Sequence, residues 1–364
     1  MKRASRSPRL IRLTLFCLTS FFALSVLAEP TPENFKVAFI GDLGISSASK
    51  KILQLIKADG AQLVLHQGDF DYRDNPAAWE HLVDSVLGHD FPYIASAGNH
   101  DAKDWFGSNG YRDRLEKRSR RVQGMACSGD HGVNGVCVYK GMLFITSGVG
   151  SIGRGTLPYL QGVLKQSDPF VWKICSWHKQ QASYQMGQKK SEVPWDYYRV
   201  CRENGAIIAQ GHEHSYSRTH TITSFSSHSI LNRSNQLRVG PGMSFTFTQG
   251  LGGEKLRGQH LCRGKGDCPH WASIYTTDQG AEPAVLFCTF NLGGQENLAE
   301  CHLKTISNKV IDQFSVVSEN NTFGKPLRSP SAVKKARPTS IYFPTEMSDM
   351  NDVWVTKDEL KECE

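Results

Sequence analysis

Short apolar runs alternate with longer amphipathic segments over about the first 220 positions of the chain. Five of the runs have the length and the aliphatic or aromatic content of buried strands, and glycine and polar residues follow each of them. This pattern predicts strands at residues 37–40, 63–65, 93–95, 171–174 and 206–209.

The segments between these runs carry apolar residues three or four positions apart, which is the spacing of an amphipathic helix. The clearest is 76–87, where Asp74 or Asn75 can cap the first turn. Repeats of strand, helix and strand favour parallel pairing, with helices on the outer faces of the sheet. Further helices are expected at residues 50–58, 157–164 and 195–203.

The pattern changes after about residue 220, because strand-like runs now follow one another without helices between them. Residues 35–318 therefore predict one α/β domain without an interior linker. Residues 319–364 hold four prolines and little periodicity, so we expect an irregular C-terminal tail. The late runs predict antiparallel strands that complete a second sheet, at residues 245–248, 284–290, 301–306 and 310–317.

The segment 1–28 has the layout of a secretory signal peptide. A basic head precedes a mostly apolar stretch at 13–27, and Val26-Leu27-Ala28 suits cleavage after a small residue. That stretch is short for a transmembrane helix, so a retained anchor is the weaker alternative. We expect removal of residues 1–28 and a protein that is secreted or otherwise extracytoplasmic, with no stable membrane span.

The net charge does not indicate a nucleic-acid partner. The whole chain has 42 basic and 35 acidic residues, a formal charge of +7. Loss of Lys2 and of the arginines at positions 3, 6, 9 and 12 leaves 37 basic against 35 acidic side chains, a charge of +2. Because no basic helix or aromatic-interleaved patch is present either, nucleic acid is not expected as a partner.

Nine cysteines remain once Cys17 is removed with the segment 1–28, an odd number for an oxidising compartment. Cys175 and Cys201 form either a pair or two buried thiols, and Cys363 is the expected leftover. Sequons at Asn232 and Asn320 fit glycosylation in a eukaryotic host. Three pairs lie close enough in sequence to close small loops: Cys127 with Cys137, Cys262 with Cys268, and Cys288 with Cys301.

A polar signature follows each of the five early strands. Ligands bind outside the carboxyl ends of strands in open α/β sheets, so these Asp, Tyr, Asn and His side chains should meet at one edge. Such residue types together predict a metal site. Each residue alone has an ordinary structural explanation, whereas the ordered set would need five coincidences. The signatures are GDLG at 41–44, GDFDY at 68–72, GNHD at 98–101, the single His178, and GHEH at 211–214.

The five signatures, in this order, resemble those of the calcineurin-like metallophosphoesterase superfamily. The Gly-Asp-x-x-Tyr form resembles its purple acid phosphatase branch. The resemblance covers residues 41–214. It implies a four-layer α/β/β/α metallophosphoesterase sandwich with two mixed sheets, and a catalytic domain over residues 35–318.

The resemblance also implies two adjacent metals bridged by Asp69. A Tyr ligand must lose a proton whose reference pKa is about 10, which favours a hard, strongly Lewis-acidic cation. We therefore expect Fe(III) at the first site and a second divalent metal, Fe, Zn or Mn, at the other. The first metal would also take Asp42, Tyr72 and His214, and the second would take Asn99, His178 and His212.

The implied reaction is hydrolysis of a phosphomonoester by a metal-bound hydroxide. Two metals roughly 3.5 to 4 Å apart supply the nucleophile and compensate the charge on the attacking and leaving oxygens. We therefore expect an acid phosphatase, a metal-dependent phosphoric ester hydrolase with a phosphate ester as its substrate. A Mn- or Zn-dependent phosphodiesterase and a non-catalytic metal-binding relative are the alternatives.

By the same resemblance, His100 lies outside the metal shell, where it assists the substrate or protonates the leaving oxygen, and Asp101 orients it. The chain departs from the better-known purple enzymes after His178, because no further histidine follows before His212. Residues near these signatures are therefore candidate substrate contacts, although solvated side chains are the ordinary alternative. They are Lys179, Lys189 and Lys190. Arg218, four residues after His214, would either steady its loop or contact a phosphate, and a solvated loop arginine is the ordinary alternative.

Overall fold

The computed structural model describes residues 30–263 and 268–320. The expected signal segment at 1–28, Cys363 and nearly all of the expected tail lie outside the described residues. Within the described ranges, no helix is long and apolar enough to cross a bilayer.

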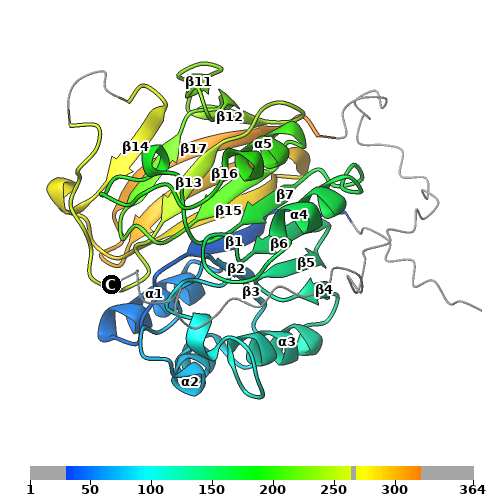
Figure 1. Ribbon diagram of the computed structural model, residues 1–364, viewed down its shortest axis with the longest axis vertical. Helices are drawn as coiled ribbons and strands as arrows, with labels where there is room; N and C mark the ends of the chain where they lie inside the picture. The colour runs from blue at the N-terminus through cyan, green and yellow to red at the C-terminus, as the bar shows by residue number, and fades with distance from the viewer. Residues whose placement is uncertain (1–29, 264–267, 321–364) are drawn as a thin grey trace, which may run out of the picture.

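Two mixed sheets form the centre of the molecule (Figure 1). The seven-stranded sheet has the order β12-β17-β16-β15-β1-β2-β3. Its strands are β1 Phe35–Ile40, β2 Leu63–His66, β3 Tyr93–Ala95, β12 Gln236–Val239, β15 Ala284–Leu292, β16 Gln295–Thr305 and β17 Val310–Ser318. The eight-stranded sheet has the order β14-β9-β13-β8-β7-β6-β5-β4. Its strands are β4 Ala126–Asp130, β5 Asn134–Tyr139, β6 Met142–Ser147, β7 Lys173–Ser176, β8 Ile207–Gln210, β9 Tyr216–Thr219, β13 Thr246–Gln249 and β14 Trp271–Tyr275. A small hairpin consists of β10 Ile222–Ser224 and β11 Ser229–Ile230.

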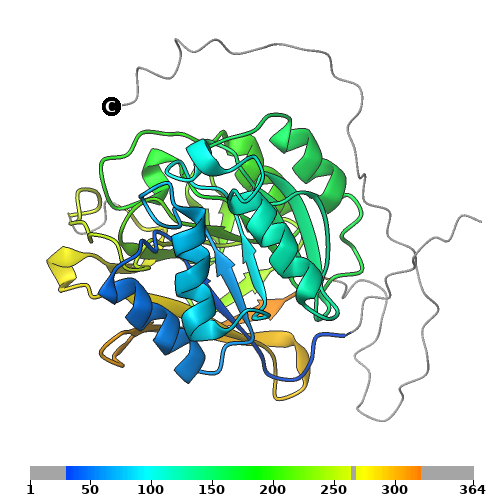
Figure 2. The same ribbon diagram turned by 90° about the horizontal axis from the view of Figure 1, so that it is seen from below.

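Helices cover the outer face of each sheet (Figure 2). Three of them pack beside the seven-stranded sheet: α1 Ser47–Ala58, α2 Pro76–Leu87 and α3 Tyr111–Arg121. Two pack on the eight-stranded sheet: α4 Thr156–Leu164 and α5 Trp195–Glu203. Between the sheets, the rings of Phe39 and Phe247 meet edge to face with centroids 5.2 Å apart. The predicted four-layer α/β/β/α sandwich is confirmed.

The sequence predicted that the late strands complete a second sheet, but most of them extend the sheet that contains β1. β15 pairs antiparallel with β1, with Val37 opposite Cys288, and β16 and β17 continue that sheet as a meander. Only β13 of the predicted late strands joins the other sheet, beside β8. The reason is that β2 pairs with only one edge of β1. The other edge is open to β15, and the apolar strands β15, β16 and β17 are buried by pairing there.

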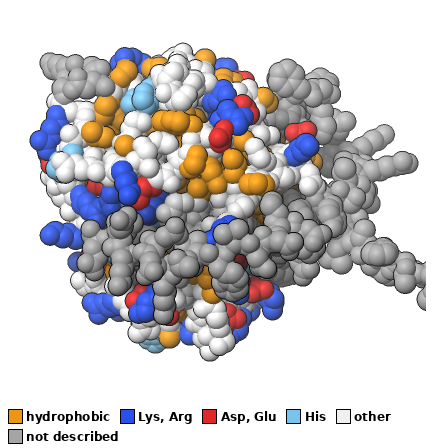
Figure 3. Space-filling model, viewed as in Figure 1, with side chains coloured by type: hydrophobic (Ala, Val, Ile, Leu, Met, Phe, Trp, Pro, Cys, Tyr) orange, Lys and Arg blue, Asp and Glu red, His pale blue; other side chains and the backbone are white. Residues whose placement is uncertain are grey.

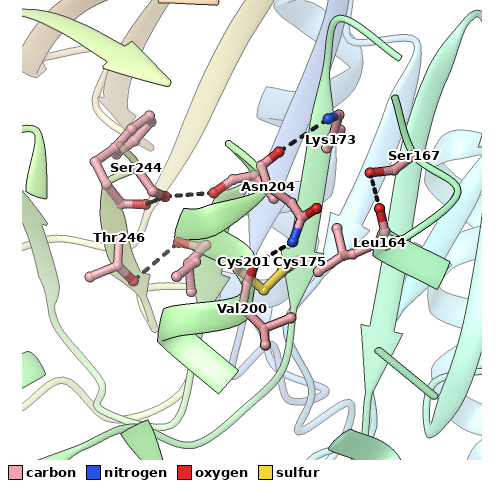
Figure 4. The surroundings of a disulfide bond; sticks show 12 residues. Leu164, Ser167, Lys173, Cys175, Val200, Cys201, Asn204, Ser244 and Thr246 are labelled. Carbon is pink, nitrogen blue, oxygen red and sulfur yellow. Dashed lines mark hydrogen bonds between the residues drawn. A yellow bond between two sulfur atoms is a disulfide. The ribbon is translucent and has the colours of Figure 1, made fainter. Parts of the chain in front are cut away.

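Four disulfides link the described residues, including the Cys175–Cys201 pair that the sequence left open. This bond ties β7 to α5 near the point where β7 leads into His178 (Figure 4). Beside it, the Lys173 ammonium donates to the backbone carbonyl of Asn204 over 3.1 Å. The other three bonds join the pairs that lie close in sequence, Cys127–Cys137, Cys262–Cys268 and Cys288–Cys301.

The surface bears on two expectations from the sequence. Figure 3 shows Lys and Arg side chains dispersed among acidic, apolar and uncharged ones on one face, without a continuous basic surface. Asn320 is buried, and its amide nitrogen donates to the carbonyls of Val171 and Gly205 over 3.1 and 2.9 Å. A glycan at Asn320 does not fit this fold, because the nitrogen that would carry it is enclosed. Asn232 is exposed.

Candidate metal centre

The loops after β1, β2, β3, β7 and β8 bring the predicted ligand side chains together. In one group, the Tyr72 phenol oxygen lies 2.8 Å from Asp42 Oδ1 and 3.0 Å from His214 Nε2. In the other, His178 Nε2 lies 3.1 Å from Asp69 Oδ2 and 3.2 Å from His212 Nδ1. The first group holds three of the four residues expected around the first metal, and the second holds Asp69, the expected bridge, with His178 and His212.

Asn99 belongs to the second group by position. The backbone N–H of its neighbour His100 donates to Asp69 Oδ1 over 2.9 Å. The side-chain oxygen of Asn99 is buried and has no hydrogen-bond partner. A buried carbonyl oxygen without a partner is costly, and a cation would satisfy it.

The donor set fits metal ions on this geometry. Ligand atoms of Asp69, His178 and His212 lie within 4.8 Å of one another, and all three residues are buried. Burial lowers the pKa of His178, but the Asp69 carboxylate outweighs it and raises that pKa to about 9. The buried Asp69 carboxylate beside this imidazole gives the pocket a negative potential, which a metal cation would neutralise.

We call the predicted ligand residues together the cluster, and four of them have an unusual backbone conformation. Asp42, Asp69, Tyr72 and His212 have φ angles of 58°, 60°, 57° and 66°. Non-glycine residues rarely adopt this left-handed region, at a cost of order 1–3 kcal/mol each. Strained backbone at four predicted ligands is the pattern of a functional site.

Glycines allow the signature loops to approach one another this closely. A Cβ added to Gly98 would lie 2.1 Å from Asp69 Oδ1. One added to Gly250 would lie 2.1 Å from the Glu213 carbonyl oxygen and 3.0 Å from Asp42 Oδ2. A side chain at position 98 would displace the Asp69 carboxylate, and one at position 250 would displace the Glu213 backbone beside Asp42. Gly250 also belongs to the glycine-rich turn at 250–253.

Each histidine of the cluster is oriented by its second nitrogen. The Nδ1 atoms of His178 and His214 lie 2.7 Å from the carbonyl oxygens of Gln67 and Lys255, respectively. These contacts leave Nε2 of both rings directed at the cluster. Such outer hydrogen bonds fix the tautomer of metal-binding histidines.

His212 is oriented by a carboxylate that the sequence did not reveal. Its Nε2 lies 3.0 Å from Glu192 Oε2, so Nδ1 faces the cluster. The Lys179 ammonium contacts the other Glu192 oxygen over 2.6 Å. Burial opposes ionisation of Glu192, but the bonds from His212 and Lys179 prevail and lower its pKa to about 2. Lys179 is therefore engaged with Glu192, and Lys190 is exposed like an ordinary surface lysine.

Asp101 differs from its expected role. Its two carboxylate oxygens accept hydrogen bonds from the backbone N–H groups of Asp69, Phe70 and Gly98, each over 2.8 Å. It thus binds the second signature loop to the third, and does not orient His100. His100 is exposed, and its ring lies 4.6 Å from the ring of Tyr72.

The expectation that Arg218 contacts substrate is wrong. Arg218 is buried on β9 and forms two bonds with Asp312 of β17, over 2.7 and 3.0 Å. Its guanidinium carbon also lies 4.1 Å from the ring centre of Phe314. Arg218 is therefore part of the core between the two sheets.

A pocket of about 440 Å³ opens beside the first group of ligands. Its lining residues are Tyr72, His100, His214, Glu254, Lys255 and Arg257. The last three residues were not predicted from the sequence, because the stretch after the glycine turn has no periodicity or motif. The pocket places His100 and two cations next to the cluster, where an anionic molecule would enter.

Comparisons with known proteins agree with this geometry. A family model described as calcineurin-like phosphoesterase matches residues 35–216. A search with the sequence among curated proteins finds no significant match.

Two solved structures share the fold. The purple acid phosphatase PPD1 from yellow lupin (Lupinus luteus) seeds aligns with a TM-score of 0.58 and 14% identity. The alignment covers 85% of this chain and 58% of the lupin chain, so the chain spans little more than half of that enzyme. GAP50, described as the anchor in the inner membrane complex of Plasmodium, aligns with a TM-score of 0.51 and 11% identity, over 79% of this chain and 90% of its own.

Proposed function

The chain belongs to the calcineurin-like phosphoesterase family, and on that basis we propose that it is a binuclear-metal acid phosphatase that hydrolyses phosphomonoesters. Fe(III) would be held by Asp42, Asp69, Tyr72 and His214. A second divalent metal, Fe, Zn or Mn, would be held by Asp69 and the residues of the second group, Asn99, His178 and His212. When bound, such a pair activates water and compensates the charge on the phosphate oxygens.

One observation carries the proposal: the Tyr72 phenol lies between Asp42 and His214, 2.8 and 3.0 Å from them. Burial and the carboxylates of Asp42 and Asp69 raise the pKa of Tyr72 well above its ordinary value. Only a highly charged cation among these groups would make the phenol a good ligand. This favours Fe(III) over a divalent ion at the first site.

His100 is the residue best placed to protonate the leaving group. It lines the pocket beside Tyr72 and His214, and its side chain is exposed to an incoming ester. A phosphate seated against the two ligand groups would direct its ester oxygen toward this open side. His100 would there donate a proton to the leaving oxygen.

The proposed location is outside the cytoplasm. Four disulfides link pairs of cysteines within the described residues. Such bonds persist in oxidising compartments. They fit the secretory signal expected at residues 1–28.

The likeness to GAP50 supports a rival, a non-catalytic anchor of the same fold. The two proposals differ in what the pocket must do, because an anchor requires neither an exposed His100 nor oriented histidines.

Purified protein lacking residues 1–28 should contain iron and hydrolyse 4-nitrophenyl phosphate faster than bis(4-nitrophenyl) phosphate. A preference for the bis-ester would favour the phosphodiesterase. Metal binding without turnover of either ester would favour the anchor.

A further inference from the structure

Two cations that no signature contains line the pocket beside the proposed centre, and a third lies on the neighbouring segment 186–190. Lys255 and Arg257 line the pocket beside His214. Lys189 comes two residues after Gly187, which lies against Glu213 of the fifth signature, and its side chain is partly buried. We call Lys189, Lys255 and Arg257 the cationic rim.

The two segments that carry the rim are fixed against each other. The Met186 carbonyl accepts hydrogen bonds from the backbone N–H groups of His260 and Leu261, over 2.7 and 3.2 Å. A Cβ on Gly187 would lie 2.4 Å from a carboxylate oxygen of Glu213, so this segment lies directly on the fifth signature. The backbone N–H of Arg257 donates to the carbonyl of His214 over 3.0 Å. The rim is thus built on the same backbone as the ligands.

The charges of the rim are incompletely balanced. Arg257 lies 3.4 Å from Glu213, and its side chain remains 40% exposed. Glu254 shares the pocket, and one of its oxygens accepts from the backbone N–H of Lys255 over 3.0 Å. Among the described residues, no hydrogen bond or ion pair engages the Lys189 ammonium. Burial and the nearby Arg257 both lower the pKa of Lys189.

The like charges of the three rim residues repel one another, and an anion among them would reduce that repulsion. The phosphate to be cleaved belongs at the ligand groups, so an anion at the rim lies on the leaving-group side of the pocket. A lysine and an arginine are the side chains that most often bind phosphate oxygens.

We infer, given the proposed phosphatase activity, that the cationic rim binds a second phosphate on the leaving group, so that the preferred substrates are diphosphates or bisphosphate esters. In the reaction, the oxygen of water bonds to phosphorus and the bond from phosphorus to the bridging oxygen breaks. The bridging oxygen leaves with the second phosphate and takes up one proton. The products are inorganic phosphate and a phosphorylated leaving group.

The test compares the metal-loaded wild type with Lys189→Met, Arg257→Gln and, as the matched control, Lys190→Met at the exposed neighbouring lysine. Lys189→Met is the primary variant, because it breaks no ion pair, whereas Arg257→Gln leaves Glu213 without its partner. The kcat/KM values are measured for 4-nitrophenyl phosphate, a nucleoside diphosphate and a hexose bisphosphate. The last two distinguish an anhydride from an ester as the preferred class.

The wild type should favour at least one doubly phosphorylated substrate over 4-nitrophenyl phosphate. Lys189→Met and Arg257→Gln should each lower the ratio of kcat/KM for that substrate to kcat/KM for 4-nitrophenyl phosphate about tenfold or more, because each removes a charge-assisted contact. Lys190→Met should leave it unchanged. An equal fall of kcat/KM on all three substrates, or no fall on any of them, would overturn the inference.

Calorimetry separates this inference from the proposed function. The metal-loaded wild type should bind inorganic pyrophosphate at least about tenfold more tightly than inorganic phosphate, and Lys189→Met should remove most of that difference. If the protein hydrolyses no ester, the proposed function fails, but this binding difference would still support the rim. Equal affinities for both anions would refute the rim even in an active enzyme.

Discussion

At the scale of single residues, the site combines strained backbone, buried side chains and a buried polar atom without a hydrogen-bond partner. Two features of the site lower the stability of the fold. The backbone is left-handed at Asp42, Asp69 and Tyr72, and the side-chain oxygen of Asn99 is buried without a hydrogen-bond partner. The sequence predicted these residues because each belongs to a motif at a strand end. It did not predict Glu192, since a long stretch without periodicity separates this glutamate from His178.

The role proposed for His100 can be tested by truncation. His100→Ala should lower kcat for a 4-nitrophenyl ester by about 10²- to 10⁴-fold, the usual contribution of a general acid. Metal content should not change, because His100 is not a predicted ligand. His81→Ala, at an exposed position on α2, is the control. An unaltered kcat, or loss of metal, would refute the assigned role.

Glu192 offers a second test at this scale, which reports metal binding. Glu192→Gln keeps the shape of the side chain but weakens the contact that orients His212. The affinity for the second metal should fall about 10- to 100-fold, while iron at the first site is retained. Titration of the second metal into the iron form measures this. Glu203→Gln, on the exposed side of α5, should have no effect, and an equal loss of both metals would contradict the assignment of His212.

At the scale of secondary structure, the sequence predicted amphipathic elements better than charged ones. Helix α3 was not predicted, because RDRLEKRSRR offers few apolar side chains. Its buried residues nevertheless serve the site, since the Tyr111 hydroxyl donates to Asp71 of the second signature over 2.6 Å. Strand β4 was also missed, because it is largely exposed and lacks clear alternation. Strands β5 and β6 are buried and were missed although β6, MLFITS, is an apolar run.

The buried pair of Arg218 and Asp312 shows what links β9 to β17. Arg218→Met should lower the free energy of unfolding by about 3–5 kcal/mol, because it leaves Asp312 as a buried unpaired charge. Urea unfolding measures this, and Arg199→Met, which breaks exposed pairs on α5, should change stability by less than about 1 kcal/mol. The kcat/KM per folded molecule should stay the same. A large specific loss of kcat/KM would restore Arg218 as a substrate contact.

At the scale of the whole molecule, the layers could be predicted but the sheet membership of the late strands could not. Repeats of strand and helix indicate a layered α/β fold wherever they occur. The pairing of β15 with β1 joins segments far apart in the chain, such as Phe35 and Phe290, and no local pattern specifies such a contact. The family resemblance supplied the four layers that periodicity alone left open.

Metal removal should destabilise the whole domain, because the cluster joins loops from both sheets. Ligands present at about 1,000 times their Kd add roughly 4 kcal/mol of stability to a folded protein. A chelator should therefore lower the Tm, and re-addition of iron and zinc should restore it. A Tm independent of chelator would mean that metals do not link the two sheets.

The central claim is that side chains from five separate loops hold two metals. A crystal structure of the protein purified without the segment 1–28, with anomalous data at the iron edge, tests this most directly. We predict an iron peak bonded to Asp42, Asp69, Tyr72 and His214, and a second metal bonded to Asp69, Asn99, His178 and His212. No metal peak among these residues in crystals of the metal-loaded protein would contradict the account.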